Sequence, residues 1–246
     1  MGNRSIGPGS YPWAAFAILL ALGFTATLLA MPLPFKLSLL LPAIVVLIGA
    51  IGVGLLLAQS TGLQALGKWQ AANDGQTRLW RLIGQPSLIG IGLGAVLLLS
   101  IRFLVAPILP QIQTRLAAEA GSPVWKRFVI AFDSAVIEEL LFRLLLLSLL
   151  AWLLSRLWHD SNGLPGRGVL RTANLLVAIG FGLAHLPTWS AVTTLTPAIV
   201  ITVVLLNSIG GITFGYLYFG WGLEAAMLAH FAADIVLHVF GPRLFL

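Results

Sequence analysis

The sequence has no cysteine and few charged residues, and each of these absences excludes a class of protein. Without cysteine there is no disulfide framework, no thiolate nucleophile and no cysteine-ligated zinc site. Charged residues make up only 9% of the 246 residues, whereas an ordinary soluble domain carries about 25%. Apolar residues reach 59% and the mean hydropathy is +0.98. The chain is therefore not a soluble globular protein.

The apolar residues are grouped into runs that could cross a lipid bilayer. A spanning helix needs about 20 apolar residues to cross about 30 Å of hydrocarbon, so this composition is enough for about seven crossings and leaves no separate soluble domain. We expect an all-α polytopic transmembrane helix bundle of about seven spans. The expected spans are residues 13–30, 37–58, 87–105, 128–157, 172–186, 197–219 and 222–240.

The predicted spans fall into two groups within a single membrane domain, residues 1–246. Residues 13–105 hold the three N-terminal spans, and residues 123–240 form a catalytic four-helix core. Between them, residues 107–126 alternate polar and apolar side chains, which is typical of an amphipathic segment at the membrane interface. Ser122 and Pro123 predict the start of the next helix, with Ser122 as its N-cap.

The chain carries a net charge of +6, an excess that in a soluble protein is compatible with binding to nucleic acid. In a multi-pass protein, basic loops beside lipid headgroups account for the same excess. We therefore expect the lipid bilayer as a partner and no nucleic acid. The predicted location is an integral, multi-pass position in a membrane, namely the plasma (inner) membrane if the host is bacterial.

Acidic residues are concentrated where they are most costly. Of the eight, five lie in or at the edge of apolar spans: Asp133, Glu138, Glu139, Glu224 and Asp234. A charge at the bilayer centre costs about 2.5–3.5 kcal/mol even on a lenient scale. Such groups are expected to face the bundle interior or a wet cavity, and they indicate a functional site there.

The spacing of charges in the fourth span predicts which pairs form. Glu139 and Arg143 are four residues apart, so they share a helix face and can form an ion pair. Glu138 is turned by about 100° from Glu139, so it cannot use the same partner equally well and stays available. The alternative is a buried ion-pair network that only fixes helix packing.

Two histidines lie in later apolar helices. His185 follows Phe181 by one turn and, taken alone, could be an ordinary hydrogen-bonded core residue. His230 and Asp234 are four residues apart on one face of the last span, so they converge on one spot, either as reactive groups or as a tether between helices. His238 lies two turns beyond His230 on the same face and is expected at the membrane interface.

Three motifs together resemble one family. Residues 138–143 fit EExxxR, residues 181–185 fit FxxxH, and residues 230–234 fit HxxxN/D. In this order, each in an apolar helix, they are similar to the CAAX protease and bacteriocin-processing (CPBP) family, which includes type II CAAX prenyl proteases. The resemblance covers about residues 134–238 and implies an intramembrane endopeptidase.

The resemblance also implies roles for the site residues. Glu138 would be the general base that activates a water molecule, and His185 would orient that water. His230 and Asp234 would face the scissile carbonyl, in what this family uses as an oxyanion hole. Glu139 would form a supporting pair with an arginine.

Two of the implied roles have alternatives. Arg143 either supports Glu139 or holds part of the substrate. Residue 234 is Asp where Asn is commoner, and an ionised carboxylate would repel an oxyanion. Asp234 is therefore protonated, or orients His230 through a hydrogen bond, or is a metal ligand.

No cofactor is favoured, and zinc is the alternative. The candidate zinc ligands would be Glu138, His185, His230 and Asp234, which could leave an open coordination position. The sequence lacks the HExxH spacing that places two ligands and a base on one helix. A metal-free glutamate mechanism is therefore preferred to a zinc-dependent metalloprotease.

The expected substrate is a peptide or the C-terminal tail of a membrane-associated protein, lipidated tails included. Two other functions use similar residues. Buried acids and histidines also form relays in proton- or ion-coupled transporters, although no repeated halves are evident in this sequence. A catalytically idle scaffold protein is the second alternative.

Overall fold

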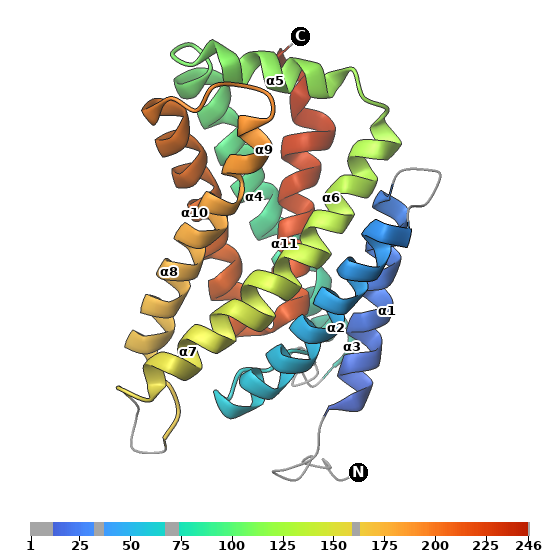
Figure 1. Ribbon diagram of the computed structural model, residues 1–246, viewed down its shortest axis with the longest axis vertical. Helices are drawn as coiled ribbons and strands as arrows, with labels where there is room; N and C mark the ends of the chain where they lie inside the picture. Colours follow the sequence, from blue (N-terminus) through green and yellow to red (C-terminus); the bar gives the residue numbers. More distant parts are fainter. Residues whose placement is uncertain (1–11, 32–36, 67–73, 159–162, 246) are drawn as a thin grey trace.

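The computed structural model describes residues 12–31, 37–66, 74–158 and 163–245, and within these residues the chain is helical and contains no strand (Figure 1). The expected all-α fold is confirmed. The α-helices are α1 (Trp13–Ala30), α2 (Leu37–Ser60), α3 (Gly75–Leu79), α4 (Gln85–Ser100), α5 (Pro110–Ala120), α6 (Val124–Glu139), α7 (Ser148–Ser155), α8 (Arg167–Ala184), α9 (Leu186–Ser190), α10 (Pro197–Trp221) and α11 (Leu223–Asp234).

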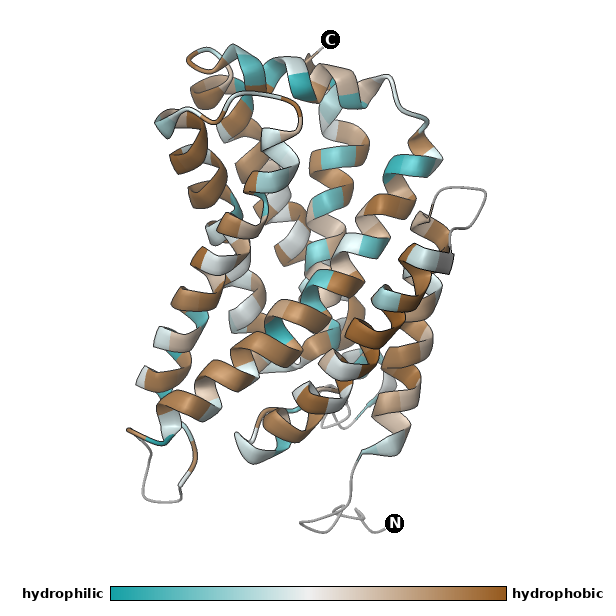
Figure 2. Cartoon of the chain, viewed as in Figure 1, coloured by the Kyte–Doolittle hydropathy of each residue, from teal (hydrophilic) through white to brown (hydrophobic). Residues whose placement is uncertain are grey.

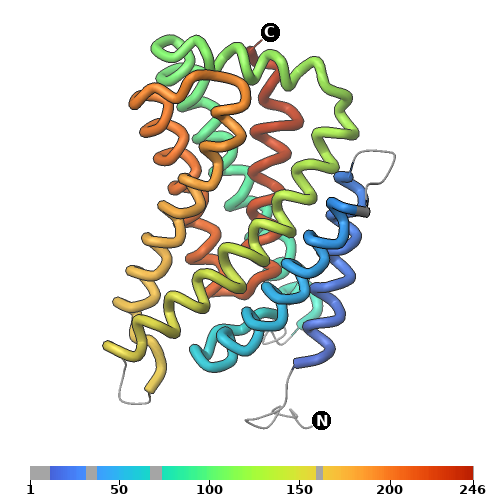
Figure 3. Tube along the Cα trace, in the orientation of Figure 1, coloured from blue at the N-terminus to red at the C-terminus, as the bar shows by residue number. Residues whose placement is uncertain are grey.

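Wider helical turns join several of these elements into continuous rods, which the chain trace follows (Figure 3). Four π-helical segments are present in the described chain: η2 (Trp80–Gly84), η3 (Ile101–Val105), η4 (Leu140–Leu147) and η5 (Ile235–Phe240). Segment η4 connects α6 to α7 without a break. Segment η5 extends α11 into a short 3-10 turn, η6 (Gly241–Phe245).

Six helices of the described chain are long and apolar enough to cross a membrane: Trp13–Ala30, Ser38–Ser60, Gly75–Val105, Arg167–Ser190, Pro197–Trp221 and Leu223–Phe245. About seven spans were expected. The expected span that is absent from these six is 128–157. It lies in the continuous helix α6–η4–α7, where Glu138, Glu139 and Arg143 interrupt the apolar run.

Two predicted helix starts were wrong. The span expected at 87–105 begins at Gly75, where Asp74 caps the helix by accepting a hydrogen bond from the Thr77 amide at 2.7 Å. Ser122 is not the N-cap of α6. Pro123 occupies that position with ψ of 137°, and the helix starts at Val124.

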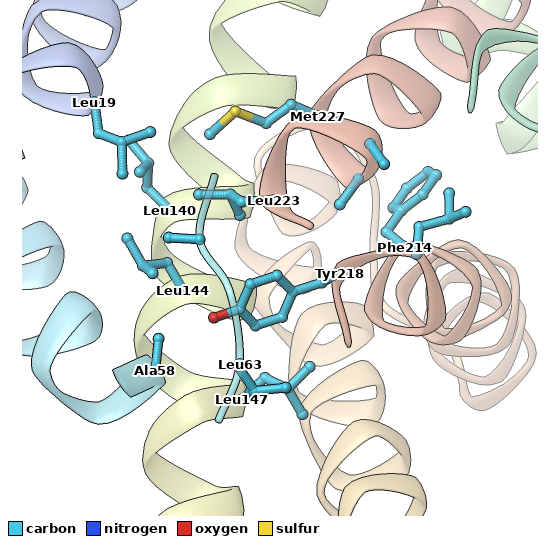
Figure 4. Packing of buried hydrophobic residues seen from close by; sticks show 14 of the residues in the cluster. Leu19, Ala58, Leu63, Leu140, Leu144, Leu147, Phe214, Tyr218, Leu223 and Met227 are labelled. Carbon is cyan, nitrogen blue, oxygen red and sulfur yellow. The ribbon is translucent and has the colours of Figure 1, made fainter. Parts of the chain in front are cut away.

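The main core lies where α1, α2, η4, α10 and α11 meet, and leucine and alanine make up most of it (Figure 4). Leu140, Leu144 and Leu147 of η4 are all fully buried. Lipid tails are as apolar as leucine, so such a core is held by close packing and internal hydrogen bonds rather than by exclusion of water. One such bond joins the hydroxyls of Ser148 and Tyr218 at 2.9 Å.

Glycines allow two pairs of helices to approach closely. A Cβ at Gly90 of α4 would collide with the backbone carbonyl of Ala229 in α11. A Cβ at Gly211 of α10 would lie 2.9 Å from the Cβ of Ala178 in α8. These contacts fix α8, α10 and α11 against their neighbours, which matters because α8 and α11 carry the predicted histidines.

Helix α5 confirms the predicted amphipathic segment as a helix and lies across one end of the bundle (Figure 1). Pro110 begins the helix, where a missing amide hydrogen costs nothing. Its buried residues Ile112 and Leu116 pack in a small second cluster with Phe245. Hydrophilic residues gather on α5 and in the middle of α6 and α11, whereas α1 and α2 are mostly apolar (Figure 2).

Candidate active site

A cavity of about 470 Å³ lies between α4, α6, α8, α10 and α11 and beneath α5. That volume is within the usual range for sites that bind small molecules or peptide segments. Four of the six predicted site residues line it, namely Glu138, His185, His230 and Asp234. The structure thus brings together side chains from three separate rods, although 92 residues separate Glu138 from His230 in the chain.

The other two predicted residues lie behind the cavity wall. Glu139 and Arg143 are 0% and 1% exposed, and Arg143 Nη1 lies 3.1 Å from Glu139 Oε1. Arg143 Nη2 also donates to the carbonyl of Gly211 at 3.1 Å. The expected ion pair is therefore present. Because Arg143 does not line the cavity, its position favours the supporting role over contact with a substrate.

Glu139 connects α6 to α11 through His230. The Oε1 atom of Glu139 accepts a hydrogen bond from Nδ1 of His230 at 2.8 Å, and this Nδ1 must carry a proton because a carboxylate only accepts. The other ring nitrogen, Nε2, is thereby directed toward the remaining acids. It lies 3.5 Å from Asp234 Oδ2 and 3.9 Å from Glu138 Oε2.

Glu138 faces the cavity, as the 100° turn from Glu139 predicts. Its side chain keeps 27% of its surface exposed, whereas Glu139 has none. The Oε2 atom of Glu138 is shielded and makes no hydrogen bond to any described residue. A carboxylate oxygen without a hydrogen bond is costly in such surroundings. The exposed part of the Glu138 side chain is what a molecule in the cavity can reach.

His185 ends α8 and is held by its own helix. Its Nδ1 lies 2.8 Å from the carbonyl oxygen of Phe181, so this nitrogen carries the proton and Nε2 is the acceptor in the neutral ring. The rings of Phe181 and His185 pack edge to face with centroids 4.8 Å apart. Phe181 also contacts the His230 ring, at 6.0 Å, and so links the two histidines.

Aromatic side chains hold the charged groups in place. The Phe214 ring of α10 stacks on His230, with centroids 4.6 Å apart and 14° between the planes. The Arg143 guanidinium lies 4.5 Å from the Phe181 ring centre and 5.5 Å from that of Phe214. Sequence reasoning did not identify Phe214, since an aromatic residue in an apolar helix carries no distinguishing signal.

Two wider turns begin directly after site acids. Segment η4 starts at the residue after Glu139, and η5 starts at the residue after Asp234. Such π-helical turns are frequent at functional sites because they displace side chains from the regular helical positions. The residues before each turn, Glu138 and His230 among them, keep ordinary helical spacing and point into the cavity from α6 and α11.

The zinc alternative can be tested against the donor set. No group of three or more His, Asp or Glu side chains among the described residues is arranged so that it could hold a metal ion. The Nδ1 atoms of His230 and His185 are engaged by Glu139 and Phe181, an arrangement that metal-ligating histidines also have, so the spacing of the four groups decides the fit. As placed, the four candidate ligands do not fit a zinc site.

The cavity extends beyond the predicted residues toward α5. There His238 Nδ1 donates to Glu119 Oε2 at 3.0 Å. Arg115 lies over the Trp189 ring at 4.1 Å, and Arg127 completes this part of the wall. Sequence reasoning assigned His238 to the membrane interface. The four-residue spacing of Arg115 and Glu119 was the one local signal for this cluster.

The charges around Glu119 are electrostatically coupled. Burial acts to raise the pKa of Glu119, but the hydrogen bond from His238 and the charges of His238 and Arg115 outweigh it, so the pKa falls below its ordinary 4.5. Burial lowers the pKa of Arg115, and the charge of Glu119 opposes this. Glu119 therefore stays ionised near neutral pH.

Comparisons with known proteins agree with the motif resemblance. A family model described as Rce1-like, type II CAAX prenyl endopeptidase Rce1-like, matches residues 120–236. This range runs from the end of α5 into η5 and contains all six predicted site residues. No curated protein and no solved structure gives a match. The resemblance to CAAX proteases is confirmed over these residues, and with six candidate spans the chain is an integral membrane protein.

Proposed function

We propose that this chain, in which residues 120–236 match the Rce1-like family of type II CAAX prenyl endopeptidases, hydrolyses a peptide bond within the membrane. One observation carries the proposal. Glu138, His185, His230 and Asp234 line a single cavity, and one oxygen of Glu138 makes no hydrogen bond to a described residue. Peptide hydrolysis requires a base, an oxyanion site and a proton donor for the leaving amine, and this set can supply all three.

Glu138 acts as the base and then as the acid. Its carboxylate takes a proton from water, and the resulting hydroxide forms a bond to the carbonyl carbon while the C=O electron pair moves to oxygen. When the tetrahedral intermediate collapses, the C–N bond breaks and Glu138 returns the proton to the nitrogen. The products are a carboxylic acid and an amine, which exchange the remaining proton to give a carboxylate and an ammonium group, and Glu138 is regenerated.

His230 stabilises the oxyanion through Nε2. Nδ1 of His230 donates its proton to Oε1 of Glu139, with 2.8 Å between the two atoms, so any second proton on the ring resides on Nε2. Asp234 Oδ2 lies 3.5 Å from that nitrogen and favours the charged ring. In this proposal Asp234 acts through His230, a role that suits Asp where Asn is the commoner residue.

His185 positions the water. With its proton on Nδ1, the neutral ring presents Nε2 to the cavity as an acceptor for one water hydrogen. A water molecule held between this nitrogen and Glu138 would have its remaining lone pair free for attack. The Glu139–Arg143 pair supports the site from behind and touches no substrate.

The substrate proposed is the C-terminal tail of a membrane-associated protein, including a lipidated tail, or a membrane-associated peptide. A protease family that acts on such proteins supports this class. Hydrolysis without a metal cofactor is part of the proposal. For a bacterial host we propose the plasma (inner) membrane as the location.

The test uses the full chain in proteoliposomes with a library of quenched fluorescent peptides that carry a lipid anchor. Cleavage by the wild type should fall by about 10²- to 10⁴-fold in Glu138→Gln, the range for loss of a general base. The control is Asp133→Asn, which makes the same carboxyl-to-amide change on α6 at a residue that does not line the cavity. Retained cleavage in Glu138→Gln would refute the proposed base.

Treatment with a chelator distinguishes metal-free hydrolysis from a zinc-dependent mechanism. We expect unchanged turnover after dialysis against a strong zinc chelator. Loss of turnover that returns with added zinc would favour the metalloprotease instead. Proton flux without any cleavage would favour a transporter.

A further inference from the structure

Two asparagines lie in membrane-spanning helices, and they are used differently. Asn174 of α8 is 2% exposed, and its Nδ2 donates across the helix interface to the carbonyl of Ile212 in α10 at 2.9 Å. Asn207 of α10 is half-buried and lines the cavity. Its Nδ2 donates to the carbonyl of Val203 in its own helix at 2.8 Å, and no hydrogen bond joins its side chain to another helix of the described chain. Asn207 is therefore not a tether between helices.

The packing of α8 against α10 does not need Asn207. Ser208, the next residue, donates to the carbonyl of Ala178 in α8 at 3.1 Å, and Gly182 and Gly211 let the two helices approach closely. A polar side chain in a spanning helix is costly unless it is paired with another helix or faces a polar cavity. The position of Asn207 is thus explained by the cavity and not by helix packing.

The hydrogen bond to Val203 determines which way the amide of Asn207 is turned. A backbone carbonyl only accepts, so the side-chain atom that contacts it must be the nitrogen. The carbonyl oxygen Oδ1 is then left as an acceptor for a molecule in the cavity. The N–H of a peptide bond is a donor that matches this oxygen.

The place of Asn207 along α10 relates it to the reacting centre. Asn207, Gly210 and Phe214 all line the cavity. Asn207 and Phe214 are seven residues apart, which corresponds to two turns and about 10 Å along the helix axis. Phe214 stacks on His230, the proposed oxyanion donor. An extended chain advances about 3.3–3.6 Å per residue, so Asn207 lies about three residues along the substrate from the cleaved bond.

Gly210 lies between Asn207 and Phe214 on this wall and leaves the helix backbone uncovered. A Cβ at this position would project against the Phe214 ring, 3.5 Å from its nearest atom. Because glycine has no side chain, another backbone can approach it closely. An extended peptide can therefore lie along α10 from the His230 ring to the amide of Asn207.

We propose that Asn207 binds the main chain of the substrate, with Oδ1 accepting a hydrogen bond from one peptide N–H about three residues from the cleaved bond. The inference rests on the proposed peptidase function and adds a substrate-binding residue to it. A contact with the main chain does not depend on the side chains of the substrate. It therefore fixes the register of peptides of different sequence relative to Glu138 and His230.

The experiment removes one substrate N–H at a time. A lipid-anchored quenched peptide from the library is synthesised as a series in which an ester replaces one amide near the cleaved bond, on either side of it. An ester keeps the chain length but has no N–H. With the full chain in proteoliposomes, the ester at the contact with Asn207 should lower kcat/KM by about 3- to 10-fold, the effect of one hydrogen bond. Mass spectrometry of the fragments checks that the same bond is cleaved.

Substitution then assigns that N–H to its partner. Asn207→Ala should slow cleavage of the unmodified peptide by the same factor, and the ester at that position should then cause no further loss, while the other esters keep their effects. Thr213→Ala is the matched control. Thr213 is on the same helix and donates to the carbonyl of Ile209, four residues earlier, at 3.0 Å, but it does not line the cavity. Its ester profile should equal that of the wild type.

The outcomes separate this inference from the proposed function. If the wild type cleaves no peptide of the library, the peptidase proposal itself fails. If Asn207→Ala leaves the rate for the unmodified peptide unchanged, or slows every peptide of the series by the same factor, the peptidase stands and the main-chain contact is refuted. The ratio of ester to amide rates does not depend on the amount of folded enzyme, so poor folding of a variant cannot produce the expected result.

Discussion

Nδ1 of His230 donates a hydrogen bond to Oε1 of Glu139 across 2.8 Å, and this contact joins α11 to α6 inside the bundle. The same carboxylate oxygen lies 3.1 Å from Arg143. One oxygen atom therefore serves both the stability of the fold and the orientation of a candidate catalytic ring. The predictions below separate these two effects.

Glu139→Gln should lower kcat more than it raises KM. The amide keeps the size of the side chain, but it can present its NH₂ group to Nδ1 and so release the ring from its tautomer. We expect about a 10²-fold loss in kcat, similar to the loss of one oxyanion donor. Steady-state kinetics with the quenched peptide would measure this. An equal loss with Ser155→Ala, outside the cavity, would contradict it.

Arg143→Met should destabilise the protein by about 3–5 kcal/mol, because Glu139 is then left buried without its cation. In the double variant Glu139→Gln/Arg143→Met, the buried charge is gone and most of that stability should return while activity stays low. Thermal unfolding in detergent measures the first effect and peptide cleavage the second. Equal melting temperatures for the single and double variants would refute the assignment.

Gly90→Ala should destabilise the bundle by about 1–3 kcal/mol through overpacking, since the added methyl meets the backbone of Ala229. Cleavage should fall as well, because Ala229 precedes His230. The matched control is Gly92→Ala on the same helix, where the methyl meets nothing within 4 Å and helix propensity favours alanine by about 1 kcal/mol. Identical melting shifts for the two variants would rule out the close contact.

Glu119 should make stability depend on pH in the acid range. Its folded pKa lies below the ordinary 4.5, so its stabilising effect is fully present above about pH 4.5. The effect is lost as the pH falls through the folded pKa, where protonation weakens the contacts with His238 and Arg115. Melting temperatures of the wild type and Glu119→Gln should therefore converge at low pH. A constant difference between the two at every acid pH at which both stay folded would contradict this.

The sequence predicted those parts of the site that depend on spacing within one helix. Glu139 with Arg143 and His230 with Asp234 form pairs because residues four apart share a face. The exposure of Glu138 beside the burial of Glu139 follows from the turn between consecutive residues. These relationships depend on α-helical geometry and little else.

Contacts between helices were not predictable in the same way. The bond from His230 to Glu139, the stacking of Phe214 on His230 and the approach of Gly90 to Ala229 depend on how distant segments pack. The contribution of α5 to the cavity wall was not predicted, for a related reason. Arg115 and Glu119 have the pattern of an interfacial helix, and only the fold shows that they line the same cavity as Glu138.

Helix α6 carries both Arg127 and Glu138 on the face that lines the cavity. Its rotational phase is therefore as important as its composition. One residue inserted between them would lengthen their separation by about 1.5 Å and rotate one relative to the other by about 100°. Arg127 and Glu138 could then no longer face the cavity together, so an insertion that keeps every side chain of the site would still change which of them line it.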